Sequence, residues 1–389
     1  MNRSSTSDLF QITSDSSNLD ERTGADSLHK LVPMLQFQNP NLRQEKYNPS
    51  TVFMPQIGFG TYKFKKDSGE AEEAVLRALS VGYRHIDTAF IYGGEKTELE
   101  VGRALQQAMS DNTTDGTSST SGLKRSEIFI TTKQWRAYHG YEKTKQCLAK
   151  SLKRLQVDFV DLYLMHWPGP NPADDKACIN MPELRAETWR AMEDLCLEGK
   201  CRAIGVSNCS IVHLESLKQY KGKACRLWPP AVNQIEVHPY HPQTELIEYC
   251  KNEGITIQAY ASLGGQDAGK KAWKVLGGKL LERKEVQQIA QKHSLTNAQV
   301  LLQWAVVQGF GVIPKSSNVN HMVQNLEAVT TCCSPQEDGN NKEAEVRRLD
   351  TVDMELLKSL DLSQSKDETI RDRIRLCWVR DPLKMLDFE

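Results

Sequence analysis

Apolar residues follow two alternating patterns along this chain of 389 residues. Short runs rich in β-branched and aromatic residues are typical of strands, and longer stretches with apolar residues three and four apart are typical of amphipathic helices. The strand-like runs lie at residues 54–61, 83–87, 128–133, 161–166, 202–208, 231–237, 256–260 and 311–316. The helical stretches lie at residues 69–81, 96–108, 142–155, 183–198, 211–220, 244–252, 281–293, 297–307 and 318–328.

Eight strand-like runs that alternate with helices predict an α/β fold, a (β/α)8 TIM barrel in a single domain. The alternative is an open, doubly wound sheet. Gly58 and Gly60 supply half of the glycine fingerprint of that fold, but no third glycine follows and no helix begins there. The incomplete fingerprint favours the barrel over a Rossmann sheet.

Polar stretches flank and interrupt the barrel pattern. Residues 1–45 predict a disordered N-terminal tail, and residues 46–389 are assigned to the barrel domain. Two polar insertions, at residues 110–122 and 331–348, show no apolar periodicity, so we expect them at the surface.

Composition narrows the classes of function. The 49 Lys and Arg residues nearly balance the 50 Asp and Glu residues, which gives no electrostatic case for a nucleic-acid or anionic-membrane partner. No apolar run approaches the roughly 20 residues of a membrane-spanning helix. The sequence also lacks a repeated unit, which argues against a solenoid scaffold.

The ten cysteines do not resemble a disulfide framework. Several, such as Cys147, Cys196 and Cys250, lie inside strand-like or helical runs, and no C-x-x-C pair occurs. The N-terminus has neither the apolar core of a secretory signal nor the acid-poor composition of a transit peptide. These features favour a reducing compartment, and we expect a cytoplasmic location.

Three consecutive strand-like runs lead to ionisable side chains. Asp87 ends one run and Tyr92 follows on the next loop, while Lys133 and His166 end the next two runs. The C-terminal strand ends form the active face of a parallel barrel, so we expect these four to converge. Tyrosine is a poor acid at neutral pH unless a cation lowers its pKa, and Lys133 is the candidate cation. The alternative for Asp87 and Lys133 is a structural ion pair inside the barrel.

Five short motifs make the chain similar to the aldo-keto reductases over roughly residues 50–385. They are Asp87-Thr88-Ala89-x-x-Tyr92, Leu164-Met165-His166-Trp167-Pro168, Gly205-Val206-Ser207-Asn208, Asn233-Gln234-Ile235-Glu236-x-His238-Pro239 and Ile313-Pro314-Lys315-Ser316. The resemblance implies a TIM barrel that binds NADPH without a Rossmann domain and reduces aldehydes or ketones to alcohols.

The resemblance further implies that Asp87, Tyr92, Lys133 and His166 form a catalytic tetrad. Tyr92 would give a proton to the carbonyl oxygen as it accepts negative charge, and Lys133, held by Asp87, would lower the pKa of that phenol. His166 would orient and polarise the substrate oxygen.

The same resemblance implies a set of cofactor contacts. Ser207, Asn208 and Gln234 match the groups that hold the nicotinamide carboxamide, and Tyr260 matches the aromatic that stacks on the nicotinamide ring. The further cofactor positions are Ser262, Leu263, Lys315, Ser316, His321 and Asn325, of which Lys315 and Ser316 match the pair at the 2′-phosphate and Asn325 matches an adenine contact. For any of the strand-end polar residues, simple capping is the alternative.

Two positions depart from the family's usual pattern. His321 stands where the family usually has an arginine, and a neutral imidazole cannot make a permanently charged, bidentate phosphate contact. NADH use beside NADPH therefore stays open. Tyr62 stands where a tryptophan is common and changes one wall of the substrate pocket. Trp135 and Trp167 match aromatic pocket positions, with core packing as their alternative.

We therefore predict an NADPH-dependent carbonyl reductase that acts as a monomer on small-molecule carbonyl substrates and needs no metal. A second hypothesis is a non-catalytic, nicotinamide-cofactor-binding regulatory subunit of the same fold. The complete set of four polar residues favours the enzyme.

Overall fold

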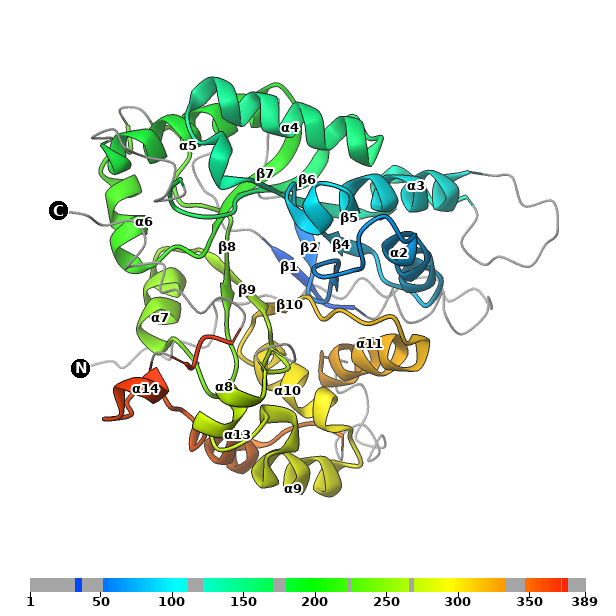
Figure 1. Ribbon diagram of the computed structural model, residues 1–389, viewed down its shortest axis with the longest axis vertical. Coiled ribbons are helices and arrows are strands. Elements are labelled where there is room, and N and C mark those ends of the chain that lie inside the picture. The colour runs from blue at the N-terminus through cyan, green and yellow to red at the C-terminus, as the bar shows by residue number, and fades with distance from the viewer. Residues whose placement is uncertain are drawn as a thin grey trace, which may run out of the picture.

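A computed structural model describes residues 32–36, 52–110, 122–170, 180–222, 225–265, 269–333, 347–371 and 373–376. Within these ranges, a ring of parallel strands lies at the centre and helices surround it (Figure 1). The predicted (β/α)8 barrel is confirmed.

The strands of the barrel follow one another around the ring in chain order. They are β3 (Phe59–Gly60), β4 (His85–Asp87), β5 (Phe129–Gln134), β6 (Val160–Met165), β7 (Cys201–Ser207), β8 (Val232–Glu236), β9 (Thr256–Tyr260) and β10 (Gly311–Val312). Ile57, just before β3, pairs in parallel with Val312 of β10. The backbone N–H of Gly58 donates to the Val312 carbonyl and that of Val312 to the Gln56 carbonyl, both at 2.8 Å. These bonds close the ring, so the sheet has no free edge at this point.

All of the predicted helices occur, with ends that shift by a few residues. They are α2 (Glu70–Ser80), α3 (Thr97–Met109), α4 (Tyr141–Leu155), α5 (Met181–Leu197), α6 (Ile211–Lys218), α7 (Thr244–Asn252), α9 (Lys284–His293), α10 (Asn297–Val306) and α11 (Val319–Cys333). The structure adds the short helices α8 (Lys270–Val275), α13 (Thr351–Lys358) and α14 (Glu368–Arg371) and the 3-10 turns η2 (Tyr92–Gly94), η3 (Arg125–Glu127), η4 (Arg136–Tyr138) and η5 (Leu280–Glu282).

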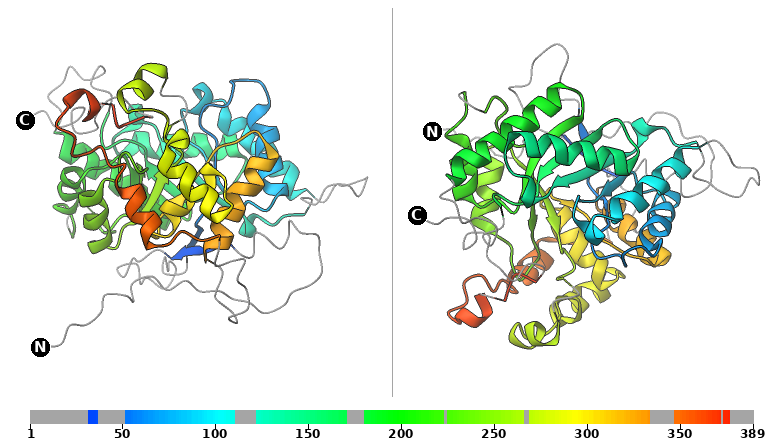
Figure 2. Two further views of the ribbon diagram at one scale, coloured as in Figure 1. Left: turned by 90° about the horizontal axis from the view of Figure 1, so that it is seen from below. Right: turned by 45° about the horizontal axis from the view of Figure 1, so that its top comes forward.

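A two-stranded hairpin covers the N-terminal end of the barrel. Its strands β1 (Met34–Gln36) and β2 (Phe53–Pro55) pair antiparallel, and Figure 2 shows them in blue at one end of the ring. Leu35 and Met54 are buried here with inward-facing barrel residues, which gives this apolar stretch a reason to order. The predicted tail of residues 1–45 is therefore wrong at residues 34–36. Residues 1–31 and 37–45 of that tail, and most of both predicted insertions, lie outside the described residues.

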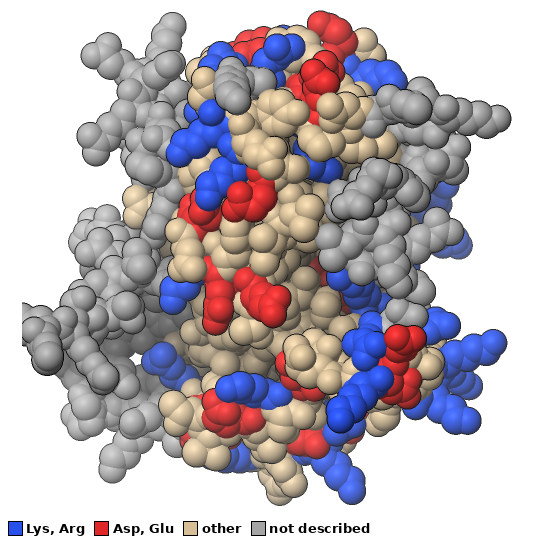
Figure 3. Space-filling model, turned by 90° about the vertical axis from the view of Figure 1, so that its left-hand side faces the viewer, with Lys and Arg blue, Asp and Glu red and all other residues tan. Residues whose placement is uncertain are grey.

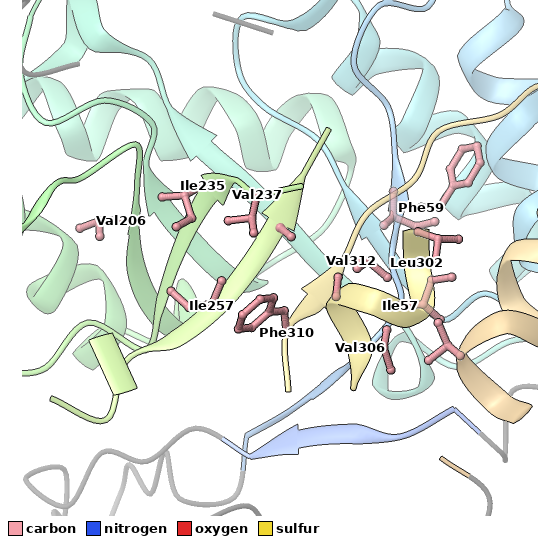
Figure 4. Packing of buried hydrophobic residues seen from close by; sticks show 14 of the residues in the cluster. Ile57, Phe59, Val206, Ile235, Val237, Ile257, Leu302, Val306, Phe310 and Val312 are labelled. Carbon is pink, nitrogen blue, oxygen red and sulfur yellow. The ribbon is translucent and has the colours of Figure 1, made fainter. Parts of the chain in front are cut away.

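Alternate residues of each strand face opposite sides of the barrel wall, because side chains alternate with a period of two. On β6, Leu162 and Leu164 lie in the cluster inside the barrel, whereas Tyr163 and Met165 lie in the larger cluster between strands and helices. Figure 4 shows part of that outer cluster, where Val312 of β10 lies near Leu302 of α10. Full burial of a side chain of this size contributes about 1.5–3 kcal/mol. Because neighbouring residues of a strand face opposite sides, the packing of the outer side chains against the helices also sets the direction of the inward side chains.

The surface carries both signs of charge. Figure 3 shows Lys and Arg interspersed with Asp and Glu on one face, in keeping with the near-zero net charge. Over the described ranges, no helix combines the length and the apolar composition needed to cross a bilayer.

Candidate active site at the C-terminal end of the barrel

The alternation of strand residues places several polar side chains at the last inward positions before the C-terminal mouth. Asp87 ends β4, Lys133 is the last inward residue of β5, and both side chains are almost fully buried. The Lys133 Nζ donates to Asp87 Oδ1 at 2.5 Å and to the Thr88 carbonyl at 2.8 Å. The second Asp87 oxygen accepts a 2.7 Å hydrogen bond from Gln234 Nε2 on β8.

Burial is the dominant influence on both charges of this pair. It lowers the pKa of Lys133 and raises the pKa of Asp87, because each ion loses its hydration. The partner's charge opposes both shifts, and the Gln234 amide further favours the carboxylate. Each ion therefore depends on the other, and removal of either one would leave a buried, unpaired charge.

Tyr92 reaches the ion pair from the loop after β4. Its hydroxyl lies 3.3 Å from Lys133 Nζ, which also lies 4.9 Å from the centre of the tyrosine ring. The loop turns back within three residues because Gly93 and Gly94 adopt φ angles of 57° and 61°. A Cβ on Gly93 would also approach Thr97 Oγ1 to 2.5 Å, so this position requires glycine.

His166 follows β6 and faces Tyr92, with ring centres 5.8 Å apart. The pKa of its imidazole lies well below the usual range, because burial disfavours the charged form and Lys133 and Arg136 add positive charge nearby. A neutral imidazole can donate one hydrogen bond to a carbonyl oxygen without adding a charge. Trp135 packs edge-on against the same ring at 5.9 Å.

The predicted carboxamide-binding groups lie together on β7, β8 and β9. Ser207 Oγ donates to the Gln234 carbonyl at 2.7 Å, and Asn208 Nδ2 donates to Ser207 Oγ at 3.2 Å and to the His166 carbonyl at 2.9 Å. The Tyr260 hydroxyl donates to Asn208 Oδ1 at 2.7 Å. This network fixes the orientation of all these side chains before any ligand binds.

Gln258 was not among the site residues predicted from the sequence. Its side chain helps to orient the Gln234 amide. Gln234 Nε2 donates to Gln258 Oε1 at 2.6 Å in addition to Asp87. Both N–H groups of Gln234 are thus used inside the barrel, and the free capacity of its side chain is that of an acceptor. Gln258 is the inward residue before Tyr260 on β9, so the period of two could have identified it.

These residues border a cavity of about 190 Å³ at the mouth of the barrel. Its wall includes Tyr62, Tyr260, Ser262, Leu263 and Lys315 among the predicted binding positions, together with Asp87, Tyr92, His166, Ser207, Asn208 and Gln234. A larger cavity of about 650 Å³ lies at the opposite end, beside β1 and α10, and contains none of the four tetrad residues. The smaller cavity is therefore the candidate active site.

Six predicted positions do not line this cavity, namely Lys133, Trp135, Trp167, Ser316, His321 and Asn325. Near the start of α11, Ser316 is half-buried and His321 is exposed, and Ser316 Oγ accepts from the Asn318 backbone N–H. Asn325 is buried on α11, and its side chain bonds to that of Tyr83. Trp167 is 2% exposed, with the guanidinium of Arg136 5.5 Å from its ring, so it packs in the core.

Comparison with known proteins agrees with this geometry. Residues 56–341 match the family described as "Aldo/keto reductase family". The chain is 37% identical over 304 residues to the glycerol 2-dehydrogenase (NADP(+)) of Saccharomyces cerevisiae, covering 74% of this chain and 87% of the yeast protein. It is 40% identical over 277 residues to the glyoxal reductase of Bacillus subtilis, covering 71% and 83%. A crystal structure of an aldo/keto reductase from Brucella melitensis matches with a TM-score of 0.63 and 33% identity, covering 85% of this chain and 98% of the other.

Proposed function

This chain belongs to the aldo/keto reductase family, and we propose that it reduces aldehydes or ketones to alcohols with NADPH. The observation that carries the proposal is Lys133, whose ammonium lies between the Asp87 carboxylate and the Tyr92 hydroxyl. When bound, NADPH supplies the hydride for the carbonyl carbon. The residues around the cavity then have to stabilise the negative charge that develops on the carbonyl oxygen and to deliver a proton to it.

Tyr92 is the proton donor in this proposal. The nearby Lys133 ammonium favours the phenolate that forms as the proton leaves, and Asp87 keeps the lysine in place. His166, held neutral by burial, donates a hydrogen bond that positions the carbonyl oxygen beside the Tyr92 hydroxyl. Tyr62 and Trp135 supply aromatic surface beside these two residues, at ring distances of 5.0 Å from Tyr92 and 5.9 Å from His166.

The side chains at the mouth suit a nicotinamide carboxamide. Gln234 presents an acceptor for its NH₂ group, Ser207 and Asn208 add hydroxyl and amide chemistry, and the Tyr260 ring offers a stacking surface. Lys315, at the edge of the cavity, supplies a cation for a 2′-phosphate. Ser262 and Leu263 complete this wall. We assign Ser316, His321 and Asn325 to the adenosine side of the same cofactor, beyond the described cavity.

A steady-state screen of aldehydes and ketones with NADPH and with NADH tests the proposal. We expect NADPH oxidation that depends on the carbonyl substrate. The alternative, a cofactor-binding regulatory subunit, predicts NADPH binding without turnover of any carbonyl, so stoichiometric binding with no oxidation would favour it. The arrangement of Asp87, Tyr92, Lys133 and His166 supports the enzyme.

We also expect the enzyme to act as a monomer in the cytosol. Cys147, Cys209, Cys225 and Cys250 are buried free thiols, as suits a reducing compartment. Light scattering after size exclusion, together with fractionation of cells, tests both expectations.

A further inference from the structure

Glu236 ties the C-terminal segment of the chain to the barrel. It ends β8, one inward position beyond Gln234, and is 4% exposed. The backbone N–H of Leu376 donates to Glu236 Oε1 at 2.5 Å, and His238 Nε2 lies 3.1 Å from the same oxygen. Glu236 and Leu376 are 140 residues apart in sequence, so this bond joins two distant parts of the chain. In Figure 1 the red trace after α14 runs toward β8 and β9.

Leu376 in turn lies directly against the wall of the active-site cavity. A Cβ built on Gly265 would be 2.7 Å from Leu376 Cβ and 3.4 Å from its carbonyl oxygen. Gly265 has a φ of 52°, which also favours glycine. Because Gly265 lines the same cavity as Tyr92 and His166, Leu376 contacts the outer side of that wall.

The wall at this point is a short loop after β9. Ala261, Ser262, Leu263 and Gly265 all line the cavity. Gly264 N–H donates to the Ala261 carbonyl at 2.7 Å, and Ser262 Oγ donates to the Ala259 carbonyl at 3.3 Å. Two buried side chains also pack against the loop, Leu280 against Gly264 and Leu376 against Gly265.

We propose that Glu236 is a positioning residue that holds Leu376 against Gly265 and thereby keeps the 261–265 loop in the geometry that receives the nicotinamide cofactor. A hydrogen bond to an ionised carboxylate is roughly twice as strong as one between neutral groups. A neutral residue at position 236 would therefore hold the C-terminal segment less firmly, and the loop would lose support on its outer side. The identity of the ligand as NADPH rests on the proposed function. The contact from Glu236 through Leu376 to Gly265 does not depend on it.

The first test replaces Glu236 by glutamine and uses Glu193→Gln as a matched control. Glu193 on α5 is also buried and also accepts backbone N–H groups, from Arg226 at 2.7 Å and Leu227 at 2.6 Å, but none of these residues lines the cavity. Both variants remove a buried charge, so both should lower the melting temperature. Only Glu236→Gln should speed hydrogen exchange at residues 373–376 and 261–265.

Cofactor binding gives the second readout. We expect Glu236→Gln to raise the Kd for NADPH by roughly two- to thirtyfold, the usual range for coupling through a supporting contact, while Glu193→Gln leaves it unchanged. Leu376→Pro removes the N–H donor instead of the acceptor and should give the same two effects if Glu236→Gln does not fold. The double variant should be no worse than the more severe single variant, because both remove the same bond.

Two results would overturn the proposal. One is unchanged exchange at residues 261–265 in Glu236→Gln, and the other is an unchanged Kd for NADPH in a wild-type enzyme that binds it. If wild-type protein fails to bind NADPH, the proposed function is wrong, and the exchange measurement alone still decides whether Glu236 supports the loop.

Discussion

Gln258 accepts a 2.6 Å hydrogen bond from Gln234, the residue that also donates to the catalytic-site carboxylate of Asp87. The pair orients the Gln234 amide so that its oxygen, not its nitrogen, is available at the mouth of the barrel. Asp87 and the cavity at the mouth are therefore linked through the Gln234 side chain, whose orientation Asp87 and Gln258 fix together.

Replacing Gln258 with leucine should affect both stability and binding. One Gln234 N–H would lose its buried partner, which costs about 1–3 kcal/mol of unfolding free energy. The freed amide could rotate, so we expect the Kd for NADPH to rise by roughly tenfold. The matched control is Gln303→Leu on α10, another buried glutamine, which bonds to the Arg347 carbonyl away from the site. The control variant should lose stability but keep its NADPH affinity. Equal changes of Kd in both variants would contradict a role of Gln258 in orienting Gln234 for NADPH binding.

Tyr92→Phe removes the proton donor and retains the ring. Carbonyl reduction should slow by about two to four orders of magnitude, the usual contribution of a general acid. NADPH affinity, measured by fluorescence titration, should stay near the wild-type value. A variant that retained most of its reduction rate would show that another group supplies the proton.

Lys315→Met tests the origin of cofactor selectivity. Lys315 is exposed at the cavity edge, with its Nζ 3.2 Å from the Lys63 carbonyl, and His321 stands in place of the usual arginine. Its loss should weaken NADPH binding by roughly 1.5–3 kcal/mol while NADH binding changes little. Equal weakening of the two cofactors would remove Lys315 from the 2′-phosphate site.

Acid should destabilise the protein through its buried histidines. Burial lowers the pKa of His85, His139 and His213 to about 3, whereas the unfolded side chains titrate near 6.5. Between these values the unfolded state binds more protons, so stability falls as the pH drops below about 6.5, by roughly 1.4 kcal/mol per pH unit for each histidine. His139→Gln should reduce this slope between pH 6.5 and 5 in urea titrations, whereas the exposed-site variant His321→Gln should not.

Replacing residues 110–122 by a short Gly/Ser turn should leave catalysis close to wild type. The two ends of this insertion meet where Leu123 N–H donates to the Ala108 carbonyl at 3.2 Å, between α3 and β5. That connection leads into the N-terminal end of β5, opposite the catalytic mouth. Reduction rate and NADPH Kd are the readouts, and protease cleavage within the insertion should disappear. A large loss of activity in a folded variant would place the insertion near the site.

The sequence predicted the fold and the convergence of Asp87, Tyr92, Lys133 and His166, because both follow from where the strands end. Strand-like runs of period two place Asp87, Lys133 and His166 at strand ends, and the topology of a parallel barrel brings strand ends together. Gln258 was not predicted as a site residue because it belongs to no recognised motif. The contact between Glu236 and Leu376 was not predicted because no local pattern specifies a contact between residues 140 positions apart.

Resemblance by position also has physical limits. Trp167 aligns with an aromatic pocket position but is 2% exposed, with its ring stacked on that of His166 at 6.4 Å and the Arg136 guanidinium 5.5 Å away. The average polarity of residues 1–45 predicted a disordered tail, and this prediction missed strand β1. Leu35 of that strand is nevertheless buried against the barrel. Averages over tens of residues do not detect three residues that complete a core.

Among the described residues, β1 and β2 pack against the interior of the barrel at its N-terminal end, and the cavity beside Tyr92 lies at the C-terminal mouth. Met54 of β2 lies at the N-terminal end, with its sulfur 3.5 Å from Gln258 Nε2, and the Asp87–Lys133 pair lies above it with almost no solvent contact. Because Tyr92 lines this cavity, we expect the proton that it gives up to be replaced from solvent through the mouth that also admits the substrate. Reprotonation and departure of the alcohol would then share one route, and we expect proton exchange at Tyr92 to slow while a ligand occupies the cavity.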